Sequence, residues 1–332
     1  MKRMKRMSLV LSAILVLAAT IVAASPGTNT AGAGSGSVNV MYAGSLVGLM
    51  QEKFGPAFTR VTGYTFQGEG RGSVALANLI KARARTPDIF ISADPKVNTT
   101  LQGPANGNYV SWWTTFAATE MVIGWSPKSK YASRFRAIAN GKNKDPKALT
   151  RLLATKGLRF GRTDPQVDPK GYRTLFQFYL DGLRLKDPGL SKRVLGAPDN
   201  PEQIFLEEQL VARLQTGELD AGSFYKIEAV EAKLPFLTLP KEINLATTSQ
   251  AKNYAKAKYT NSAGVTFVGA PIVYTVTIPS TVRNRPGAIA FVRYLLRNGQ
   301  KQLRKDGLRA MPFVLAGDRA AVPAEIQPLV KR

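Results

Sequence analysis

The chain has 332 residues, 44% of them hydrophobic, which is enough for one large or two medium domains with hydrophobic cores. It carries 46 Lys and Arg against 22 Asp and Glu, a formal net charge of +24, and it has neither His nor Cys. These absences exclude disulfides, thiol catalysis, Cys/His zinc sites and His-based triads, so we do not expect an enzyme.

The first 24 residues have the composition of an export signal. A basic start, MKRMKRM, precedes the apolar run SLVLSAILVLAATIVAA, and Val22-Ala23-Ala24 offers small residues for cleavage. We therefore predict a signal peptide over residues 1–24 and an exported protein, periplasmic or extracellular, with an uncleaved N-terminal anchor as the alternative. Residues 25–37, SPGTNTAGAGSGS, are predicted to be a flexible linker.

Three strand–loop–helix units follow within about 65 residues, a pattern typical of a parallel α/β sheet. The strands are predicted in residues 38–44, 63–73 and 88–94, and the first two lead into helices with Ser45 and Ser73 as N-caps. Ligands of such sheets bind beyond the carboxyl ends of the strands. Each serine would offer a hydroxyl, a backbone N–H and a helix N-terminus to an anion; the alternative is that both are ordinary caps.

The middle of the chain is predicted to form a second α/β lobe, and its end to return to the first. The expected elements are strands over 121–125, 158–162, 221–225, 236–239 and 269–279, a loop over 163–173, and helices over 145–157, 174–180, 201–217 and 286–299. The predicted first lobe comprises residues 38–118 and 269–332, and the second residues 119–268.

Three motifs in chain order carry a resemblance to a known family. YAGSL at 42–46, GRGSV at 70–74 and DPKGYR at 168–173 resemble the periplasmic molybdate/tungstate-binding proteins of ABC importers, and DIFISAD and GELDAGSFYK support the match. The resemblance implies a two-lobed α/β fold of the periplasmic-binding-protein type (type II), with a hinge and a ligand cleft between the lobes. It also implies a monomer, a membrane permease as partner and no cofactor.

The resemblance also implies a set of binding residues. From the first lobe, Gly44, Ser45 and Ser73 would contact the oxyanion; from the second, the turn Asp168-Pro169-Lys170 and Tyr225 would do so. In one branch of the family a glutamate on the helix before the tyrosine strand also reaches the ligand. The spacing points to Glu207, with Glu208 as its immediate rival.

The chemistry of the ligand explains this set. Molybdate and tungstate accept hydrogen bonds but donate none near neutral pH, so hydroxyls and backbone N–H groups suit them. A carboxylate should repel a dianion by ~4 kcal/mol at about 4 Å with an effective dielectric of ~20. Asp168 and Glu207 make sense there if their oxygens bond the Mo or W centre, which can take more than four ligands. Otherwise Asp168 is a turn residue and Glu207 a solvated one.

Other functions stay open at this point. A sulfate or phosphate receptor of the same fold is one alternative, because a monoprotonated phosphate needs an acceptor that a carboxylate could supply. A basic surface protein or a nucleic-acid-binding protein is another, suggested by the charge. Its cations are spread along the chain without a nucleic-acid motif, so we expect a solvated basic surface and no nucleic-acid partner.

Overall fold

The computed structural model describes residues 34–331. The predicted signal peptide and most of the predicted linker therefore lie outside the described residues, while Ser37, the last linker residue, begins the first strand. Within 34–331, no helix is both long and apolar enough to cross a bilayer.

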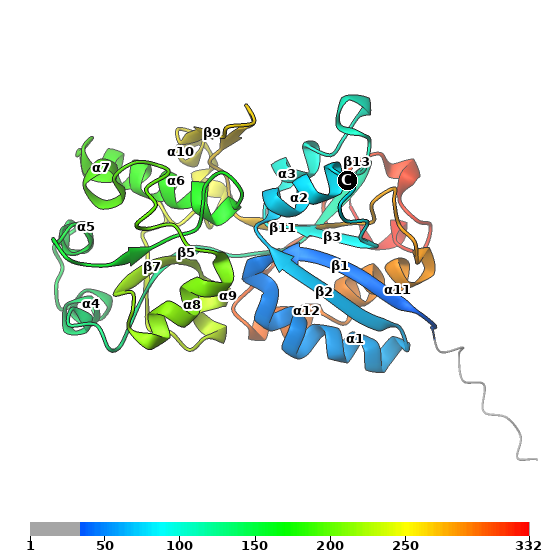
Figure 1. Cartoon of the computed structure of the whole chain (residues 1–332), viewed down its shortest axis with the longest axis horizontal. Coiled ribbons are helices and arrows are strands. Elements are labelled where there is room, and N and C mark those ends of the chain that lie inside the picture. Colours follow the sequence, from blue (N-terminus) through cyan, green and yellow to red (C-terminus); the bar gives the residue numbers. More distant parts are fainter. Residues whose placement is uncertain (1–33, 332) are drawn as a thin grey trace, which may run out of the picture. The chain divides into compact units, whose positions relative to one another are not determined.

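The strands and helices alternate along most of the chain (Figure 1). The strands are β1 (Ser37–Ala43), β2 (Thr65–Arg71), β3 (Ile89–Ser92), β4 (Trp112–Ala118), β5 (Met121–Trp125), β6 (Phe160–Gly161), β7 (Ala221–Tyr225), β8 (Phe236–Thr238), β9 (Lys258–Thr260), β10 (Thr266–Val268), β11 (Val273–Thr277), β12 (Arg309–Ala310) and β13 (Leu315–Gly317). The α-helices are α1 (Gly55–Thr62), α2 (Ser73–Lys81), α3 (Pro95–Thr99), α4 (Ala132–Ala139), α5 (Ala148–Leu153), α6 (Pro169–Arg184), α7 (Leu190–Leu195), α8 (Glu207–Thr216), α9 (Lys226–Glu231), α10 (Ala251–Tyr254), α11 (Arg285–Arg297) and α12 (Gln300–Lys305). Single 3₁₀ turns occupy Gly44–Leu46, Pro104–Asn106, Thr248–Gln250, Arg319–Ala321 and Gln327–Leu329, and a π-helical turn occupies Leu49–Phe54.

The first lobe is built on a seven-stranded sheet in the order β12-β4-β11-β3-β1-β2, with β13 also paired to β4. Strand β1 is parallel to both β2 and β3, as predicted for the opening units. The other pairings are antiparallel, so the sheet as a whole is mixed. Helix α11 returns to this lobe, where Phe291 packs edge-on against Phe54 and Phe58.

The second lobe is built on a four-stranded sheet in the order β6-β7-β5-β8. Strands β6 and β7 are parallel, and the other pairs are antiparallel. The hairpin of β9 and β10 packs over α6, where the Phe267 and Tyr172 rings stack with centroids 4.3 Å apart. The predicted two-lobed α/β fold is therefore confirmed.

The chain passes between the two sheets twice, at 119–120 and at 269–272. The two crossings lie side by side, because the Thr119 N–H donates to the Ile272 carbonyl at 3.2 Å. Gly269 is required at the second crossing, since a Cβ there would collide with the Tyr254 carbonyl. Two short adjacent connections of this kind are suited to act as a hinge.

Several helix starts differ from the sequence prediction. Helix α6 begins at Pro169 rather than at 174. The segment 201–217, predicted to be helical toward its end, forms α8 from Glu207 and ends at the predicted C-cap Gly217. After β1 the chain forms a 3₁₀ turn and a π-helical turn before α1. The π-helical turn directly precedes Pro56, which has no N–H to donate to the Glu52 carbonyl, so regular α-helical bonding is interrupted there.

Candidate functional site

The carboxyl ends of the parallel strands from both sheets meet at one place. Strands β1, β2 and β3 lead directly into Ser45, Ser73 and Asp94, and strand β7 ends at Tyr225. The loop after β6 leads to Asp168 at the start of α6. This is where an open α/β sheet offers helix starts and loops to a ligand.

Ser45 lies inside the 3₁₀ turn that follows β1. Its prediction as an N-cap is wrong: Ala43 occupies that position, and no side chain caps the turn. The Ser45 side chain is buried, and its Oγ lies 2.8 Å from Tyr274 Oη on β11. The hydroxyl therefore faces the interior of the site and is not used to start a helix.

Ser73 is the first residue of α2 and is fully buried. Its prediction as an N-cap is also wrong, since Gly72 holds that position without a side-chain cap. Ser73 Oγ accepts a hydrogen bond from the Ala93 N–H at 3.1 Å. A backbone N–H can only donate, so the hydroxyl proton of Ser73 remains available for another acceptor.

Asp168 is the N-cap of α6, and Pro169 follows as the first helical residue. Asp168 Oδ1 accepts from the Lys170 N–H at 2.8 Å. Its second oxygen, Oδ2, is buried and has no hydrogen-bond partner of good geometry among the described residues, although the nearby Thr163 hydroxyl lowers the pKa of this carboxyl. Capping thus uses one half of the carboxylate and leaves the other half free.

Glu207 is the first residue of α8 and is turned inward by the helix period. Leu210 and Leu214, three and seven positions further on, are buried in the second lobe, and Glu207 shares their face. Its carboxylate lies against Gly44 of the first lobe, where an added Cβ would collide with it. The rival residue, Glu208, is exposed.

Lys170 is fully buried between glutamates. Its Nζ lies 3.0 Å from Glu207 Oε1 and 2.5 Å from Glu228 Oε1. Burial alone would lower the pKa of Lys170, but the carboxylates of Glu207, Glu228 and Asp168 outweigh burial and raise it. Lys170 therefore keeps its proton, and its charge is directed at the glutamates.

The carboxylates of the site are strongly desolvated. Burial raises the pKa of Asp168, and it raises the pKa of Glu207 well above the usual range, with the Asp168 charge adding to the effect. Within residues 34–331, no group of three or more Asp, Glu, His or Cys is arranged to hold a metal ion.

Tyr225 ends β7 and is buried. Its Oη lies 2.6 Å from Arg173 NH1, and its backbone N–H donates to Glu228 Oε2 at 2.9 Å. The predicted site residues all lie where the two lobes meet. They are Gly44, Ser45, Ser73, the Asp168-Pro169-Lys170 turn, Glu207 and Tyr225.

The sequence prediction missed four residues of this region: Arg173, Glu228, Asp94 and Tyr274. Arg173 stands in the DPKGYR motif, and its spacing of three from Lys170 on a helix places both on one face, which could have identified it. Glu228 stands three residues after Tyr225, the spacing of a capping box, and its carboxylate does accept from the Tyr225 N–H. Asp94 ends the DIFISAD motif and, standing before Pro95, has the pattern of a helix N-cap, whereas Tyr274 gave no local signal.

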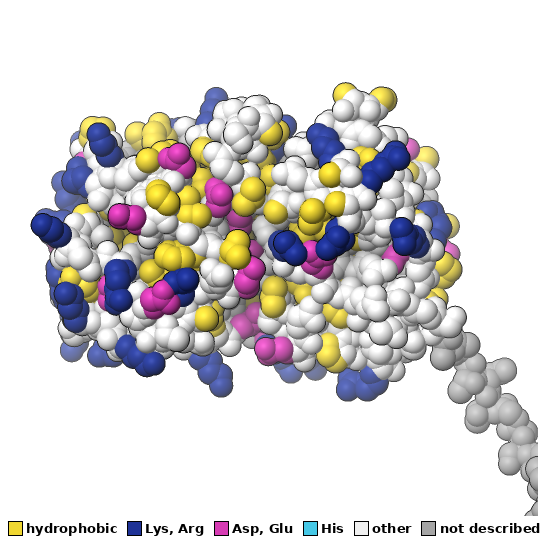
Figure 2. Space-filling view, viewed as in Figure 1, with side chains coloured by type: hydrophobic (Ala, Val, Ile, Leu, Met, Phe, Trp, Pro, Cys, Tyr) yellow, Lys and Arg dark blue, Asp and Glu magenta, His cyan; other side chains and the backbone are white. Residues whose placement is uncertain are grey.

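A cavity of about 490 Å³ adjoins the site on the side of α8 and α9. Gly44, Ser45, Glu207 and Glu228 line it, and so does Glu231. Figure 2 shows that acidic side chains gather along the boundary between the lobes, while Lys and Arg lie mostly on the outer surface. Of the described Lys and Arg side chains, only those of Arg162, Lys170 and Arg173 are buried, so the others lie at least partly on the solvated surface.

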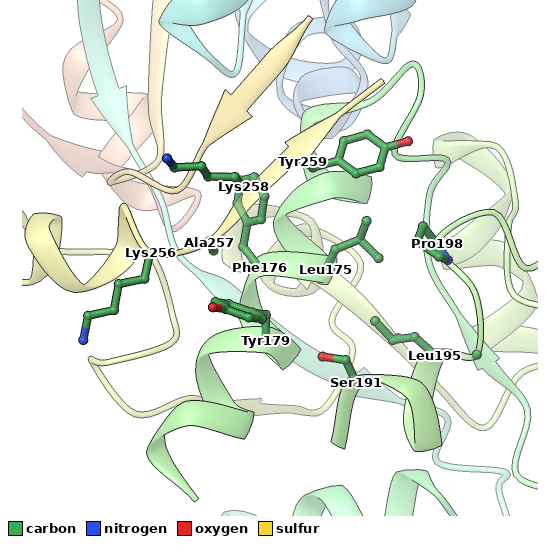
Figure 3. A pocket seen from close by; sticks show the side chains of 11 residues that line it. Leu175, Phe176, Tyr179, Ser191, Leu195, Pro198, Lys256, Ala257, Lys258 and Tyr259 are labelled. Carbon is green, nitrogen blue, oxygen red and sulfur yellow. The ribbon is translucent and has the colours of Figure 1, made fainter. Parts of the chain in front are cut away.

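A second cavity of about 390 Å³ lies between α6, α7 and β9, within the second lobe (Figure 3). The apolar side chains of Leu175, Phe176 and Leu195 line it, and the amino groups of Lys256 and Lys258 point away from it. None of the predicted site residues lines this cavity. It therefore lacks the polar character of the interlobe site.

The cavity between the lobes is lined by Gly44, Ser45 and Glu207 of the predicted site, whereas Ser73, Asp168, Lys170 and Tyr225 do not line it. Two lobes joined by two adjacent crossings, with hydroxyls and carboxylates from both lobes where they meet, are typical of a receptor for a small polar solute. The sequence matches a known family of this class, because residues 38–309 match the bacterial extracellular solute-binding proteins. The chain belongs to that family.

Individual relatives cover most of the chain. A putative ABC transporter molybdenum-binding protein of Haloferax volcanii is 33% identical over 268 residues, 80% of each chain. The molybdate/tungstate-binding protein WtpA of Pyrococcus abyssi is 31% identical over 289 residues, also 80% of each chain. Among solved structures, the periplasmic molybdate-binding protein of Azotobacter vinelandii has a TM-score of 0.57 and 18% identity, over 82% of this chain and 99% of that one, a likeness of fold alone.

Proposed function

We propose that the protein is an exported receptor that captures tungstate or molybdate between its two lobes and delivers it to an ABC importer in the membrane. Two relatives that match four fifths of the chain are described as binding molybdenum, or molybdate and tungstate. The oxyanion would be the transported cargo, not a cofactor. We further propose that the protein is a monomer and has no nucleic-acid partner.

The relatives favour molybdate or tungstate, and one observation of the structure argues against sulfate: the buried Asp168 Oδ2 without a hydrogen-bond partner. A buried carboxylate oxygen without a partner costs free energy, so a ligand that bonds to this oxygen would remove that cost. Mo(VI) and W(VI) can accept an oxygen from Asp168 and another from Glu207. The sulfur of sulfate cannot accept such an oxygen, so the two carboxylates would repel sulfate without forming a compensating bond.

The remaining groups suit the oxygens of the same ligand. Gly44, Ser45 and Ser73 would contact it from the first lobe, and the Pro169-Lys170 helix start and Tyr225 from the second. The Lys170 ammonium would offset the charge of neighbouring glutamates and so reduce their repulsion of a dianion.

A phosphate receptor of the same fold is the second candidate, and the same Asp168 oxygen favours it. Hydrogen phosphate carries one proton and would donate it to Asp168 Oδ2. A sulfate receptor fits less well, since sulfate offers nothing to that oxygen.

We also propose that the lobes comprise residues 38–118 with 269–332, and residues 119–268. The strand content of the two sheets supports this division. Export from the cell is consistent with the family, and the location and membrane partner remain part of the proposal.

Titration calorimetry of the purified protein with tungstate, molybdate, sulfate and phosphate in parallel tests the proposed function. We expect tight binding of tungstate and molybdate and weak or no binding of the other two. Phosphate binding as tight as tungstate binding would favour the second candidate, and no binding of any of the four would refute both.

A further inference from the structure

Arg173 is the buried cation of the site that contacts both lobes. It stands on α6, and its side chain is 3% exposed. Its NH1 donates to Tyr225 Oη at 2.6 Å, within its own lobe. It also donates to two acceptors of the first lobe. NH1 donates to the Ala93 carbonyl at 2.7 Å, and NH2 donates to Asp94 Oδ2 at 2.9 Å.

The chemistry of Arg173 fixes the direction of the proton on Tyr225. A guanidinium has five N–H donors and no acceptor, so Tyr225 Oη must accept in this contact. Among residues 34–331, Tyr225 Oη has one hydrogen-bond partner, which is Arg173. The phenol proton is then free to point at an acceptor in the site.

Asp94 is itself held in place for this contact. Its Oδ1 accepts from the Lys96 N–H at 2.8 Å and caps α3, which leaves Oδ2 free to face the second lobe. Tyr172 Oη donates to the same Oδ2 at 2.7 Å. Opening of the lobes would take Ala93 and Asp94 away from Arg173 together, and its hydrogen bond to Tyr225 would remain within the second lobe.

We propose that Arg173 is a positioning residue that couples lobe closure to ligand recognition: fixed by Ala93 and Asp94 of the first lobe, it holds Tyr225 Oη as an acceptor and so commits the Tyr225 proton to the bound oxyanion. The inference rests on the proposed function and adds a mechanism for selectivity. A ligand without a proton benefits from the committed donor, whereas hydrogen phosphate gains no acceptor from Tyr225.

The test is a set of variants titrated with tungstate and with phosphate: Arg173→Lys, Asp94→Asn, Tyr225→Phe and the Arg173→Lys, Tyr225→Phe double variant. Arg184→Lys is the matched control, because Arg184 stands on the same helix and pairs with Asp181 at its far end. Thermal unfolding of each variant reports on its folding.

We expect Arg173→Lys to weaken tungstate binding by about 10- to 100-fold, the range of a lost charged hydrogen bond. The same change in the Tyr225→Phe background should cost several-fold less, because the residue acts through Tyr225. The ratio of tungstate to phosphate affinity should also fall, since the Oη of a Tyr225 freed from Arg173 can accept a hydrogen bond from the proton of hydrogen phosphate. A merely structural role would weaken both ligands equally.

Unchanged tungstate affinity in Arg173→Lys, or an equal loss with and without Tyr225, would overturn the inference. Should Arg173→Lys fail to fold, Asp94→Asn decides, because it keeps Arg173 and Tyr225 and removes the charge that fixes Arg173 on closure. We expect it to weaken tungstate binding, and a wild-type value would overturn the inference. Absence of tungstate binding by the wild-type protein would refute the proposed function, and this inference with it.

Discussion

Asp168 combines two roles in one side chain. One oxygen caps α6, and the other is buried without a partner, so the residue is both a structural cap and a candidate ligand. Asp168 can therefore be a helix cap and a ligand-binding residue at once. A substitution that preserves the cap tests the binding role alone.

Replacing Asp168 with Asn and Glu207 with Gln provides that change, since both amides keep an oxygen acceptor. If the carboxylates bond the metal centre, tungstate and molybdate binding should weaken by at least about 10- to 100-fold, the loss seen even for groups that only support a metal ligand. Sulfate binding should hold or improve, because negative charge is removed. Calorimetry gives the affinities, and Glu208→Gln is the exposed neighbouring control.

X-ray absorption at the tungsten edge checks the same prediction directly. Six oxygen neighbours, two of them at longer distances, would show carboxylate ligation in the wild-type complex. A regular shell of four oxygens would contradict it and leave Asp168 and Glu207 as surroundings of the ligand.

The two serines should be needed for binding more than for folding. Each hydroxyl donor to an anion is worth about 1.5–3 kcal/mol, and neither Ser45 nor Ser73 caps a helix with its side chain. The Ser45→Ala, Ser73→Ala double variant should therefore lose binding and still unfold cooperatively. Calorimetry and thermal unfolding measure the two effects; wild-type affinity would remove both serines from the site.

At the scale of elements, the start of α2 meets the start of α6. Gly72, the N-cap of α2, lies against the turn before α6, where the Val167 carbonyl also accepts from the Ala75 N–H at 3.0 Å. A Cβ on Gly72 would lie 2.6 Å from that carbonyl oxygen and 3.0 Å from Asp168 Cβ. These are largely backbone atoms, which cannot rotate away as a side chain can.

Gly72→Ala should consequently block full closure while leaving each lobe folded. Its φ of −50° is acceptable for alanine, so the obstruction arises between the lobes rather than within α2. We expect tungstate binding to fall by more than tenfold, by the approximate free energy of an overpacked contact. Equal affinity of Gly72→Ala and wild type would contradict the prediction.

At the scale of the molecule, ligand binding should be accompanied by closure. The candidate residues come from both lobes, so an open form would bring only half of them to the ligand. Small-angle scattering of the wild-type protein should show a smaller radius with saturating tungstate than without ligand. Gly72→Ala should show little change, and an unchanged wild-type radius at saturating tungstate would count against closure unless the free protein is already closed.

The contact between the lobes also contains an acidic group with a shifted pKa. Glu231 of α9 lies against Gly48 and 3.8 Å from the Lys53 amino group, both of the first lobe. Burial raises its pKa from 4.5 to about 7; Lys53 lowers the pKa, while Asp306 and Glu228 raise it. The folded protein therefore binds this proton more tightly than the unfolded chain does.

The sign of the pH dependence follows from linkage. A carboxyl with a raised folded-state pKa contributes stability below the unfolded pKa, and this contribution is lost as the pH rises through about 7. Glu231→Gln should remove that loss and be more stable than wild type at about pH 8, by up to ~3 kcal/mol. Urea unfolding of both proteins from about pH 5 to pH 8 measures the difference, and parallel curves would contradict it.

Much of the site could be predicted because its motifs are local. Strand, turn and helix start follow one another within a few residues at Gly44-Ser45, at Ser73 and at Asp168-Pro169, and such patterns are set by backbone geometry, helix capping and hydrophobic period. Glu207 was selected differently, by the family resemblance and its spacing back from Tyr225. The two-lobed α/β fold was predictable for the same reason, together with the resemblance carried by the motifs.

Tertiary structure decided what no local pattern contains. Ser45 meets Tyr274 across 229 positions, and Arg173 meets Asp94 across 79, so neither contact leaves a trace in neighbouring residues. The caps were misassigned because a serine after a strand serves equally well as a cap or as an inward hydroxyl, and burial chooses between them. The direction of each hydroxyl proton is fixed by its distant partner, since hydrogen bonding depends on which donor the fold brings within about 3 Å.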